Sequence, residues 1–291
     1  MLLRATWALL AIGASSAAAV ASQSFDTMFA AAGNVASLAG KRAMITGASS
    51  GIGKATACAL ATEGCNLILV ARRGDKLREL QAEVQRRLPD VSVQVLQGDV
   101  TDDAFYETLQ QSGCLDDIDF LINNAGGAFG KDTILEASVA DWRGMLDANC
   151  LAAFRVVHAV LPGMVRRERG HIISTGSIAG LENYEGGSVY CAAKHALHAF
   201  HEALRYETFD KGVRCTVIAP GNVGEGTEFS AVRFKGDDAK VAGVYSGYKE
   251  LTAVDIAANI VWACKQPEHV NLQLMHVMPT AQGGATRIHR G

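Results

Sequence analysis

Short apolar runs alternate with helical segments along most of this chain, and this alternation constrains the fold more than any other feature. The runs lie at 43–45, 67–70, 91–95, 120–122, 171–174 and 215–218. Segments with helical spacing of apolar residues separate them, such as 52–63 and 77–88, the second of which ends at Pro89. Strands that alternate with helices build βαβ units and a parallel sheet covered on both faces. We therefore expect one doubly wound α/β domain over residues 40–291, with a parallel sheet of about seven strands and helices on both faces.

Composition excludes several functional classes. The chain has 291 residues, of which 49% are hydrophobic, and its net charge is -3. An extended disordered protein is poorer in apolar residues, and a nucleic-acid partner would require a large basic excess that this chain lacks. The seven cysteines form no C-x-x-C pair, which predicts free thiols in a reducing compartment. His195, His198 and His201 recur every three residues and so drift around a helix axis, and we predict no metal site.

Residues 1–39 differ from the rest of the chain. Arg4 is their only basic residue and Asp26 their only acid, and the apolar stretch 7–20 is diluted by Gly and Ser. This stretch is too short and mixed for a stable membrane span of about 20 residues. The Ala/Ser-rich, acid-poor composition favours a mitochondrial transit peptide. A secretory signal with a small-residue cleavage site at 19–21 and a peripheral arm on a cytoplasmic enzyme are the alternatives.

A glycine-rich segment, TGASSGIG at 46–53, joins the first expected strand to the first expected helix. Glycine lets the backbone approach a ligand closely, and a helix N-terminus offers free N–H groups to a pyrophosphate. The first βα turn of a doubly wound sheet is where dinucleotides bind. The segment therefore predicts dinucleotide contacts from Gly47, Ser49, Ser50, Gly51, Ile52 and Gly53.

The end of the second expected strand indicates which nicotinamide cofactor is bound. An acid there would bind the ribose 2′-hydroxyl, whereas an arginine would bind a 2′-phosphate. The strand runs into Arg72 and Arg73, whose guanidinium groups suit a phosphate. The competing acid, Asp75, precedes an expected helix and is predicted to be its N-cap. These residues favour NADP over NAD.

A tyrosine and a lysine four residues apart, Tyr190 and Lys194, open the helical segment that continues to about Phe209. A phenol has a reference pKa near 10, and a nearby ammonium group stabilises the phenolate. Ser177 follows the fifth expected strand and can present its hydroxyl to a substrate oxygen. The three residues predict hydride transfer coupled to proton transfer at a carbonyl or carbinol group.

Together these motifs resemble the short-chain dehydrogenase/reductase family, with its Rossmann fold, from Lys41 to the end of the chain. The matches are TGASSGIG at 46–53, Asp99, NNAG at 123–126, Asn149, Ser177, YCAAK at 190–194 and PG at 220–221. The resemblance implies Asn149, Ser177, Tyr190 and Lys194 as the catalytic set. Tyr190 would be the acid/base, Lys194 would bind the nicotinamide ribose, and Asn149 would support a proton-relay water. It also implies cofactor contacts from Asp99, Val100, Asn124, Ala125, Gly126, Tyr190, Lys194, Pro220, Gly221, Val223 and Thr227.

A narrower resemblance lies in residues 220–238 and 274–280, which look like NADP-dependent serine/L-allo-threonine dehydrogenases, also called 3-hydroxy acid dehydrogenases. It implies a small 3-hydroxy acid or β-hydroxy amino acid as the substrate partner. The family resemblance, together with apolar helical segments at 151–165 and 192–204, predicts a homotetramer. A carbonyl reductase for steroids, quinones or other ketones on the same fold is the alternative enzyme. A protein that binds NADPH only as a sensor or scaffold is the non-enzymatic alternative.

A free carboxylate on the substrate needs a cationic partner in a partly closed site. The segment after Pro220 supplies Arg233 and Lys235. We expect Arg233 to contact the substrate carboxylate, beside Ser177 and Tyr190. The alternative is that Arg233 and Lys235 are surface charges or contact a cofactor phosphate.

Overall fold

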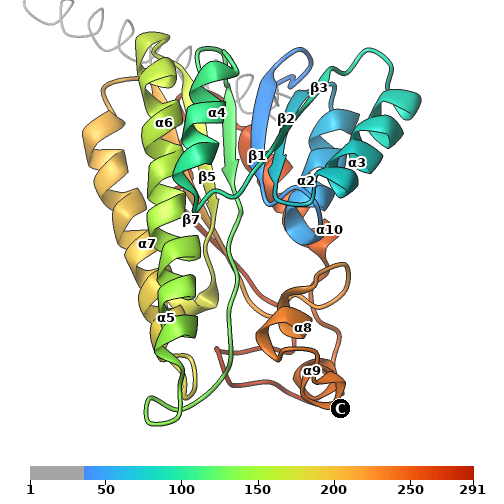
Figure 1. Ribbon diagram of the computed structural model, residues 1–291, viewed down its shortest axis with the longest axis vertical. Helices are drawn as coiled ribbons and strands as arrows, with labels where there is room; N and C mark the ends of the chain where they lie inside the picture. Colours follow the sequence, from blue (N-terminus) through green and yellow to red (C-terminus); the bar gives the residue numbers. More distant parts are fainter. Residues whose placement is uncertain (1–35) are drawn as a thin grey trace, which may run out of the picture. The chain divides into compact units, whose positions relative to one another are not determined.

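The structure is a computed structural model that describes residues 36–291, so almost all of the predicted targeting segment 1–39 lies outside the described residues. Seven parallel strands form one sheet in the order β3-β2-β1-β4-β5-β6-β7 (Figure 1). The expected doubly wound α/β fold is confirmed. The strands are β1 (Arg42–Thr46), β2 (Asn66–Ala71), β3 (Val93–Gln97), β4 (Phe120–Asn123), β5 (Gly170–Thr175), β6 (Val213–Pro220) and β7 (Leu274–Val277).

The connecting helices leave each strand at its carboxyl end and return to the next strand. They are α2 (Gly51–Thr62), α3 (Gly74–Arg87), α4 (Asp103–Gln111), α5 (Val139–Leu146), the π-helical turn η1 (Asp147–Leu151), α6 (Ala152–Arg166), the 3-10 turn η2 (Ile178–Gly180), α7 (Ser188–Thr208), α8 (Phe229–Arg233), α9 (Asp238–Tyr245) and α10 (Ala253–Cys264). In Figure 1, α8 and α9 lie below the layers formed by the sheet and its long helices.

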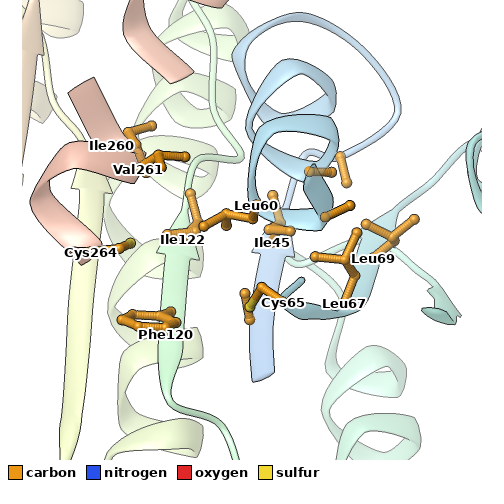
Figure 2. Packing of buried hydrophobic residues seen from close by; sticks show 14 of the residues in the cluster. Ile45, Leu60, Cys65, Leu67, Leu69, Phe120, Ile122, Ile260, Val261 and Cys264 are labelled. Atoms are coloured by element: carbon orange, nitrogen blue, oxygen red, sulfur yellow. The ribbon is translucent and has the colours of Figure 1, made fainter. Parts of the chain in front are cut away.

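Both faces of the sheet are buried because alternate residues of each strand point to opposite sides. Ile45 packs with α2, α3 and α10 on one face (Figure 2). Met44, the preceding residue, packs with α4, α6 and α7 on the other face. This is why the strands read as continuous apolar runs in the sequence instead of alternating with polar residues.

The strand order reverses between β1 and β4, which lie side by side at the centre of the sheet. Met44 of β1 pairs in register with Ile68 of β2 on one side and with Leu121 of β4 on the other. Loops from the two halves of the sheet diverge here and leave a crevice beyond the carboxyl ends of the strands. This crevice positions the site described below.

Three details of the elements differ from the sequence expectations. The third strand begins at Val93 instead of residue 91, and the strand β7 arises from a segment in which no strand was specified. The helix α3 begins at Gly74 with Arg73 as its N-cap, so Asp75 lies in the first turn. The expectation that Asp75 caps this helix is therefore wrong, because the backbone turns into the helix two residues earlier.

Two packing features bear on the limits of the domain. Leu38 is buried in the same core as β1, so the core extends before residue 40. The continuous helix Val139–Arg166, which joins α5, η1 and α6, is long and apolar enough to cross a membrane by length and composition alone. However, its residues Val156, Val157 and Val160 are fully buried against the sheet, as expected for the core helix of a globular domain.

Candidate active site

A cleft of about 1240 Å³ lies beyond the carboxyl ends of the strands. The loops that follow β1, β2, β3, β4, β5 and β6 all contribute to its walls, as is typical of the ligand crevice of an open α/β sheet. Among the residues singled out from the sequence, those that line it are Gly47, Ser49, Ser50, Gly51, Ile52, Arg72, Arg73, Asp99, Val100, Asn124, Ala125, Gly126, Ser177, Tyr190, Lys194, Pro220, Gly221, Val223, Thr227 and Arg233.

Two of the predicted site residues do not line the cleft: Gly53 and Asn149. Gly53 is buried, and a Cβ atom there would clash with the carbonyl oxygen of Gly47. Its small size lets α2 pack against the glycine loop. Asn149 is also buried, and it supports the cleft from behind, as described below.

The glycine loop has the properties of an anion cradle. Gly47 and Gly51 adopt positive φ angles of 69° and 60°, which favour glycine. The N-cap residue of α2, Ser50, makes no side-chain cap hydrogen bond. The N–H groups in the first turn of α2 are therefore free of a capping hydroxyl, and they lie at the positive end of the helix dipole. The residues of this loop fit a dinucleotide pyrophosphate.

The two arginines after β2 have different surroundings. The Arg72 side chain is 79% exposed and lies 3.7 Å from a carboxylate oxygen of Asp99, a long ion pair. Arg73 donates to the hydroxyls of Ser49 and Ser50 and forms an ion pair with Glu228 at 3.0 Å. That guanidinium group holds the pKa of the Glu228 carboxyl below its usual range. Arg72 is thus the arginine that is free to meet a phosphate from solvent.

The floor of the cleft is fixed by a threonine in β1. The hydroxyl oxygen of Thr46 accepts hydrogen bonds from the backbone N–H groups of Asn124 and Ala125, both at 2.9 Å. The side-chain amide of Asn124 donates to the Thr46 carbonyl at 3.0 Å and accepts from the Thr175 hydroxyl at 3.1 Å. Residues from β1, β4 and β5 are therefore locked together where the sheet opens. Neither Thr46 nor Thr175 is among the predicted site residues, although both stand at the ends of expected strands.

Asn149 lies in the π-helical turn η1, a helix irregularity that often marks functional sites. Its side-chain amide donates to the carbonyls of Gly127 and Met145, both at 2.8 Å, and its oxygen accepts from the N–H of Gly127 at 3.2 Å. One donor and the acceptor therefore hold Gly127 in the backbone after β4, and the second donor binds α5. The proposed proton-relay water at Asn149 stays a prediction.

Tyr190 and Lys194 project from the first turns of α7 towards the end of β5. The Lys194 ammonium group donates to the Thr175 carbonyl at 2.9 Å and lies 5.8 Å from the centre of the Tyr190 ring. Burial lowers the pKa of Lys194 from 10.5 to about 8, and the nearby Cys150 partly opposes this shift. Lys194 still carries its charge at neutral pH, close to the phenol.

Burial also raises the pKa of the Tyr190 phenol above its usual value of 10, with a smaller contribution from Tyr184. A hydrogen bond with Ser177 and the charge of Arg233 act in the opposite direction. Ser177 is held at the N-terminus of η2, where its hydroxyl accepts from the Ala179 N–H at 3.0 Å. The structure thus brings the predicted Ser177, Tyr190 and Lys194 together in one wall of the cleft.

Arg233 also lies near Tyr190, and it is 9% exposed. Its guanidinium carbon is 5.7 Å from the centre of the Tyr190 ring and 5.4 Å from that of Tyr184. Its Nε donates to the Gly130 carbonyl at 3.1 Å, whereas its Nη2 has no hydrogen-bond partner in residues 36–291. Within this same part of the chain no carboxylate forms an ion pair with Arg233. A buried guanidinium group without an anion is a strong site for one, because its desolvation is not compensated.

Lys235, only two residues further on, has a different position. Its side chain is 66% exposed and forms an ion pair with Asp141 at 2.9 Å, which raises the pKa of Lys235. The alternative that both cations are surface charges therefore applies to Lys235 and not to Arg233. Sequence could not separate them, because the two residues share one short segment.

The histidines on α7 are used in packing. The Nε2 atom of His201 lies 2.6 Å from the Ser174 hydroxyl, and burial lowers the pKa of His201 to about 3. The ring of His198 occupies the space that a Cβ atom at Gly176 or Gly180 would need. In the part of the chain that the structure describes, no group of three His, Cys, Asp or Glu residues could hold a metal ion.

The doubly wound sheet, with a glycine cradle and a Ser177–Tyr190–Lys194 arrangement at its carboxyl edge, defines an oxidoreductase. The family model described as short chain dehydrogenase matches residues 41–237. The chain belongs to this family, as the motifs predicted.

Individual relatives agree with the narrower resemblance. The NADP-dependent 3-hydroxy acid dehydrogenase of Schizosaccharomyces pombe is 43% identical over 258 residues, which cover 87% of this chain and 98% of that protein. The Escherichia coli (strain K12) protein with the same activity in its name is 40% identical over 252 residues, which cover 85% of this chain and 98% of that protein. A solved closed form of serine dehydrogenase complexed with NADP+ has a TM-score of 0.78, with 38% identity over 86% of this chain and 100% of that one.

Proposed function

We propose that this protein is an NADP-dependent dehydrogenase that acts on the C3 hydroxyl, or the corresponding carbonyl, of a small 3-hydroxy acid or β-hydroxy amino acid. The similarity to 3-hydroxy acid and serine dehydrogenases supports this proposal. The observation that carries it is the buried Arg233, which has a free Nη2 and lies beside the Tyr190 ring. A bulky apolar ketone would leave this guanidinium group without an anion, whereas a substrate carboxylate would pair with it.

The residues of the cleft fit NADP. The glycine loop would hold the pyrophosphate, Arg72 would meet the 2′-phosphate, and Asp99 and Val100 would flank the adenine. When bound, the nicotinamide supplies or accepts the hydride. The remaining cofactor contacts expected from Asn124–Gly126 and from Gly221, Val223 and Thr227 lie in the same cleft.

Tyr190 would transfer the proton at the substrate oxygen through its phenol hydroxyl, and Ser177 would orient that oxygen. Burial raises the pKa of Tyr190, so the phenol is protonated at neutral pH in the protein without cofactor. In this state Tyr190 is a proton donor, as reduction of a 3-oxo acid requires. Oxidation of the alcohol requires the phenolate, which the charges of Lys194 and Arg233 favour.

The test compares a 3-hydroxy acid with its methyl ester as substrates of the Arg233→Ala variant. If Arg233 binds the carboxylate, kcat/KM for the acid falls by roughly 100-fold, as expected for loss of a charge-assisted pair, and kcat/KM for the ester changes little. Lys235→Ala is the matched control, because Lys235 is a nearby cation that is exposed and paired with Asp141. Equal losses on acid and ester would remove Arg233 from the carboxylate site.

The same assay addresses the alternative functions. A panel of L-serine, L-allo-threonine, 3-hydroxyisobutyrate and 3-hydroxypropionate with both nicotinamide cofactors identifies the substrate. A wild-type protein that prefers esters or bulky ketones to every acid would be a carbonyl reductase. NADPH binding without turnover of any compound would indicate a sensor or scaffold.

We further propose a homotetramer. Val139, Leu146 and Leu151 expose apolar side chains on α5 and η1, and Val254, Trp262 and Leu274 expose theirs on α10 and β7. Because η1 continues into α6, which covers the other face of the sheet from α10, these are two separate patches. A dihedral tetramer requires at least two interfaces of this kind. Light scattering should give a tetramer for the wild type and a dimer for Trp262→Glu; a monomeric wild type would contradict the proposal.

We also propose mitochondrial targeting by residues 1–39, on their composition. A fluorescent protein fused after residue 39 should enter mitochondria, whereas a cytoplasmic or secreted fusion would reject the proposal.

The cysteines in the described part of the chain are free thiols, and six of these seven are buried.

A further inference from the structure

The segment 281–290, here called the strap, forms a tight hairpin after β7. Gln282 and Ile288 pair as an antiparallel bridge, and the N–H of His289 donates to the Ala281 carbonyl at 2.8 Å. Four residues of the strap line the catalytic cleft: Ala285, Thr286, Ile288 and Arg290. The strap is therefore a wall of the site that no catalytic or cofactor motif predicted.

The strap is tied to the loops around the catalytic residues. The Ala285 N–H donates to the carboxylate of Glu182 at 2.8 Å, in the segment between Ser177 and Tyr190. The Gln282 side-chain oxygen accepts from the Asn222 N–H at 2.8 Å, just after β6. These contacts fix the first part of the strap to the segments that follow β5 and β6.

At its other end, Arg290 binds the C-terminus of α9. Its Nη2 lies 3.3 Å from the carbonyl oxygens of Gly243 and Val244, and its Nη1 donates to the Ser246 carbonyl. The guanidinium carbon is 5.4 Å from the centre of the Tyr248 ring. The last carbonyls of a helix lack intrahelical partners, and a cation there also complements the helix dipole. The last turn of α9 has no basic residue. Arg290 therefore supplies both the hydrogen-bond donors and the positive charge at the C-terminus of α9 from outside the helix.

The helix α9 has little packing of its own, because none of its eight residues is fully buried. It holds α8 through Tyr245, whose hydroxyl lies 2.6 Å from the Ser230 hydroxyl and donates to the Val223 carbonyl at 2.9 Å. Ser230 lies on α8, which also carries Arg233. Residues 228–248, here called the flap, thus contain both α9 and the helix that carries Arg233, and the Tyr245–Ser230 contact connects the two.

We propose that Arg290 is a positioning residue for substrate recognition: by capping α9 from the strap, it fixes the flap so that Arg233 faces the substrate carboxylate beside Tyr190. This inference rests on the proposed function, since Arg233 is the carboxylate partner there. In this proposal Arg290 acts through α9, Tyr245 and Ser230, and not by binding the substrate directly.

The experiment compares Arg290→Ala with Arg287→Ala. Arg287 is a matched control, because it is an exposed arginine of the same strap whose side chain makes no hydrogen bond or ion pair in residues 36–291. For Arg290→Ala we expect KM for a 3-hydroxy acid to rise by roughly tenfold with little change in kcat, the loss expected when a charge-assisted contact is no longer held in place. KM for the methyl ester and the Kd of NADPH should be unchanged. Arg290→Lys keeps the charge but not the planar guanidinium group, so its KM for the acid should lie between those of the wild type and Arg290→Ala.

Two further measurements separate positioning from direct binding. Hydrogen exchange of the protein without ligands should be faster at amides 240–248 in Arg290→Ala and unchanged in Arg287→Ala. In an Arg233→Ala background, Arg290→Ala should add no further increase in KM, because both act through one contact. Additive KM effects, or unchanged exchange in the flap, would overturn the inference. Equal kcat/KM of the wild-type protein for acid and ester would reject the carboxylate site of the proposed function. The hydrogen-exchange result would then still decide whether Arg290 holds the flap.

Discussion

The carboxylate of Glu228 lies 3.0 Å from the guanidinium group of Arg73, and this ion pair joins the flap to the loop that follows β2. Ser50 donates to the same carboxylate at 3.1 Å. Arg73 is therefore committed to contacts within the protein, whereas its neighbour Arg72 extends into solvent. The two arginines, which the sequence presents as equivalent, should have separate effects on the cofactor.

Arg72→Ala should lower the preference for NADP over NAD. The exposed guanidinium group of Arg72 is available for a 2′-phosphate, and NAD has none. We expect kcat/KM for NADP to fall by roughly 10- to 100-fold and that for NAD to change little, the size of effect expected for a charge-assisted phosphate contact. Steady-state kinetics with both cofactors measure this ratio, and equal losses with both would contradict the assignment.

Glu228→Gln should strengthen NADPH binding by a few-fold without changing NADH binding. The substitution removes a carboxylate that competes with phosphate for Arg73, while keeping the shape of the side chain. Because the Arg73–Glu228 pair is largely exposed, thermal stability should change little. Fluorescence titration gives the two dissociation constants, and weaker NADPH binding in this variant would show that Glu228 supports the cofactor site instead.

Tyr190→Phe should abolish turnover and leave NADPH binding largely intact. The substitution removes only the hydroxyl that transfers the proton, and most predicted cofactor contacts lie elsewhere in the cleft. Turnover below about one thousandth of the wild-type rate is expected for loss of an acid/base group. The matched control is Tyr184→Phe, which removes the other cleft phenol near Arg233 and should retain measurable turnover. Substantial activity in Tyr190→Phe would remove Tyr190 as the acid/base.

Lys194→Met should remove a pH-dependent part of the stability. Burial lowers the folded-state pKa of Lys194 from 10.5 to about 8, so between these values the unfolded chain binds more protons than the folded chain. The contribution of Lys194 to the free energy of unfolding therefore rises as the pH increases from about 8 to 10.5 and is at its lowest below pH 8. The difference between variant and wild type should change by about 3 kcal/mol across this window, with 1.36 kcal/mol for each pKa unit.

Urea unfolding of both proteins without cofactor, at pH values from 7 to 10.5, measures this difference directly. Burial also raises the pKa of thiols such as Cys65, which makes the free energy of unfolding of both proteins depend on pH in the alkaline range. Subtracting the wild-type value from that of the variant removes this shared contribution. A difference that does not vary with pH would show that Lys194 titrates normally in the folded state.

Sequence by itself determined the fold class and most of the cleft. Strands buried on both faces must be continuously apolar, so β1, β2, β4, β5 and β6 were visible as runs. β7 was not, because an edge strand is half exposed and its four residues alternate between exposed and partly buried positions. The rule that parallel strands end at one edge places Ser177 at the site without any knowledge of its contacts, and the family resemblance adds Asn124.

Only the tertiary structure decided which charges in the cleft are free and which are paired. Arg233 and Lys235 are neighbours in sequence, but Arg233 packs against Gly130, 103 positions away, while Lys235 reaches Asp141 at the surface. Glu228 meets Arg73 across 155 positions, and Arg290 meets α9 across more than forty. The burial and pairing of a charge depend on every element that packs around it, and those elements come together only when the chain folds. Local pattern therefore predicts which side chains reach a cleft, and long-range packing determines what each can bind there.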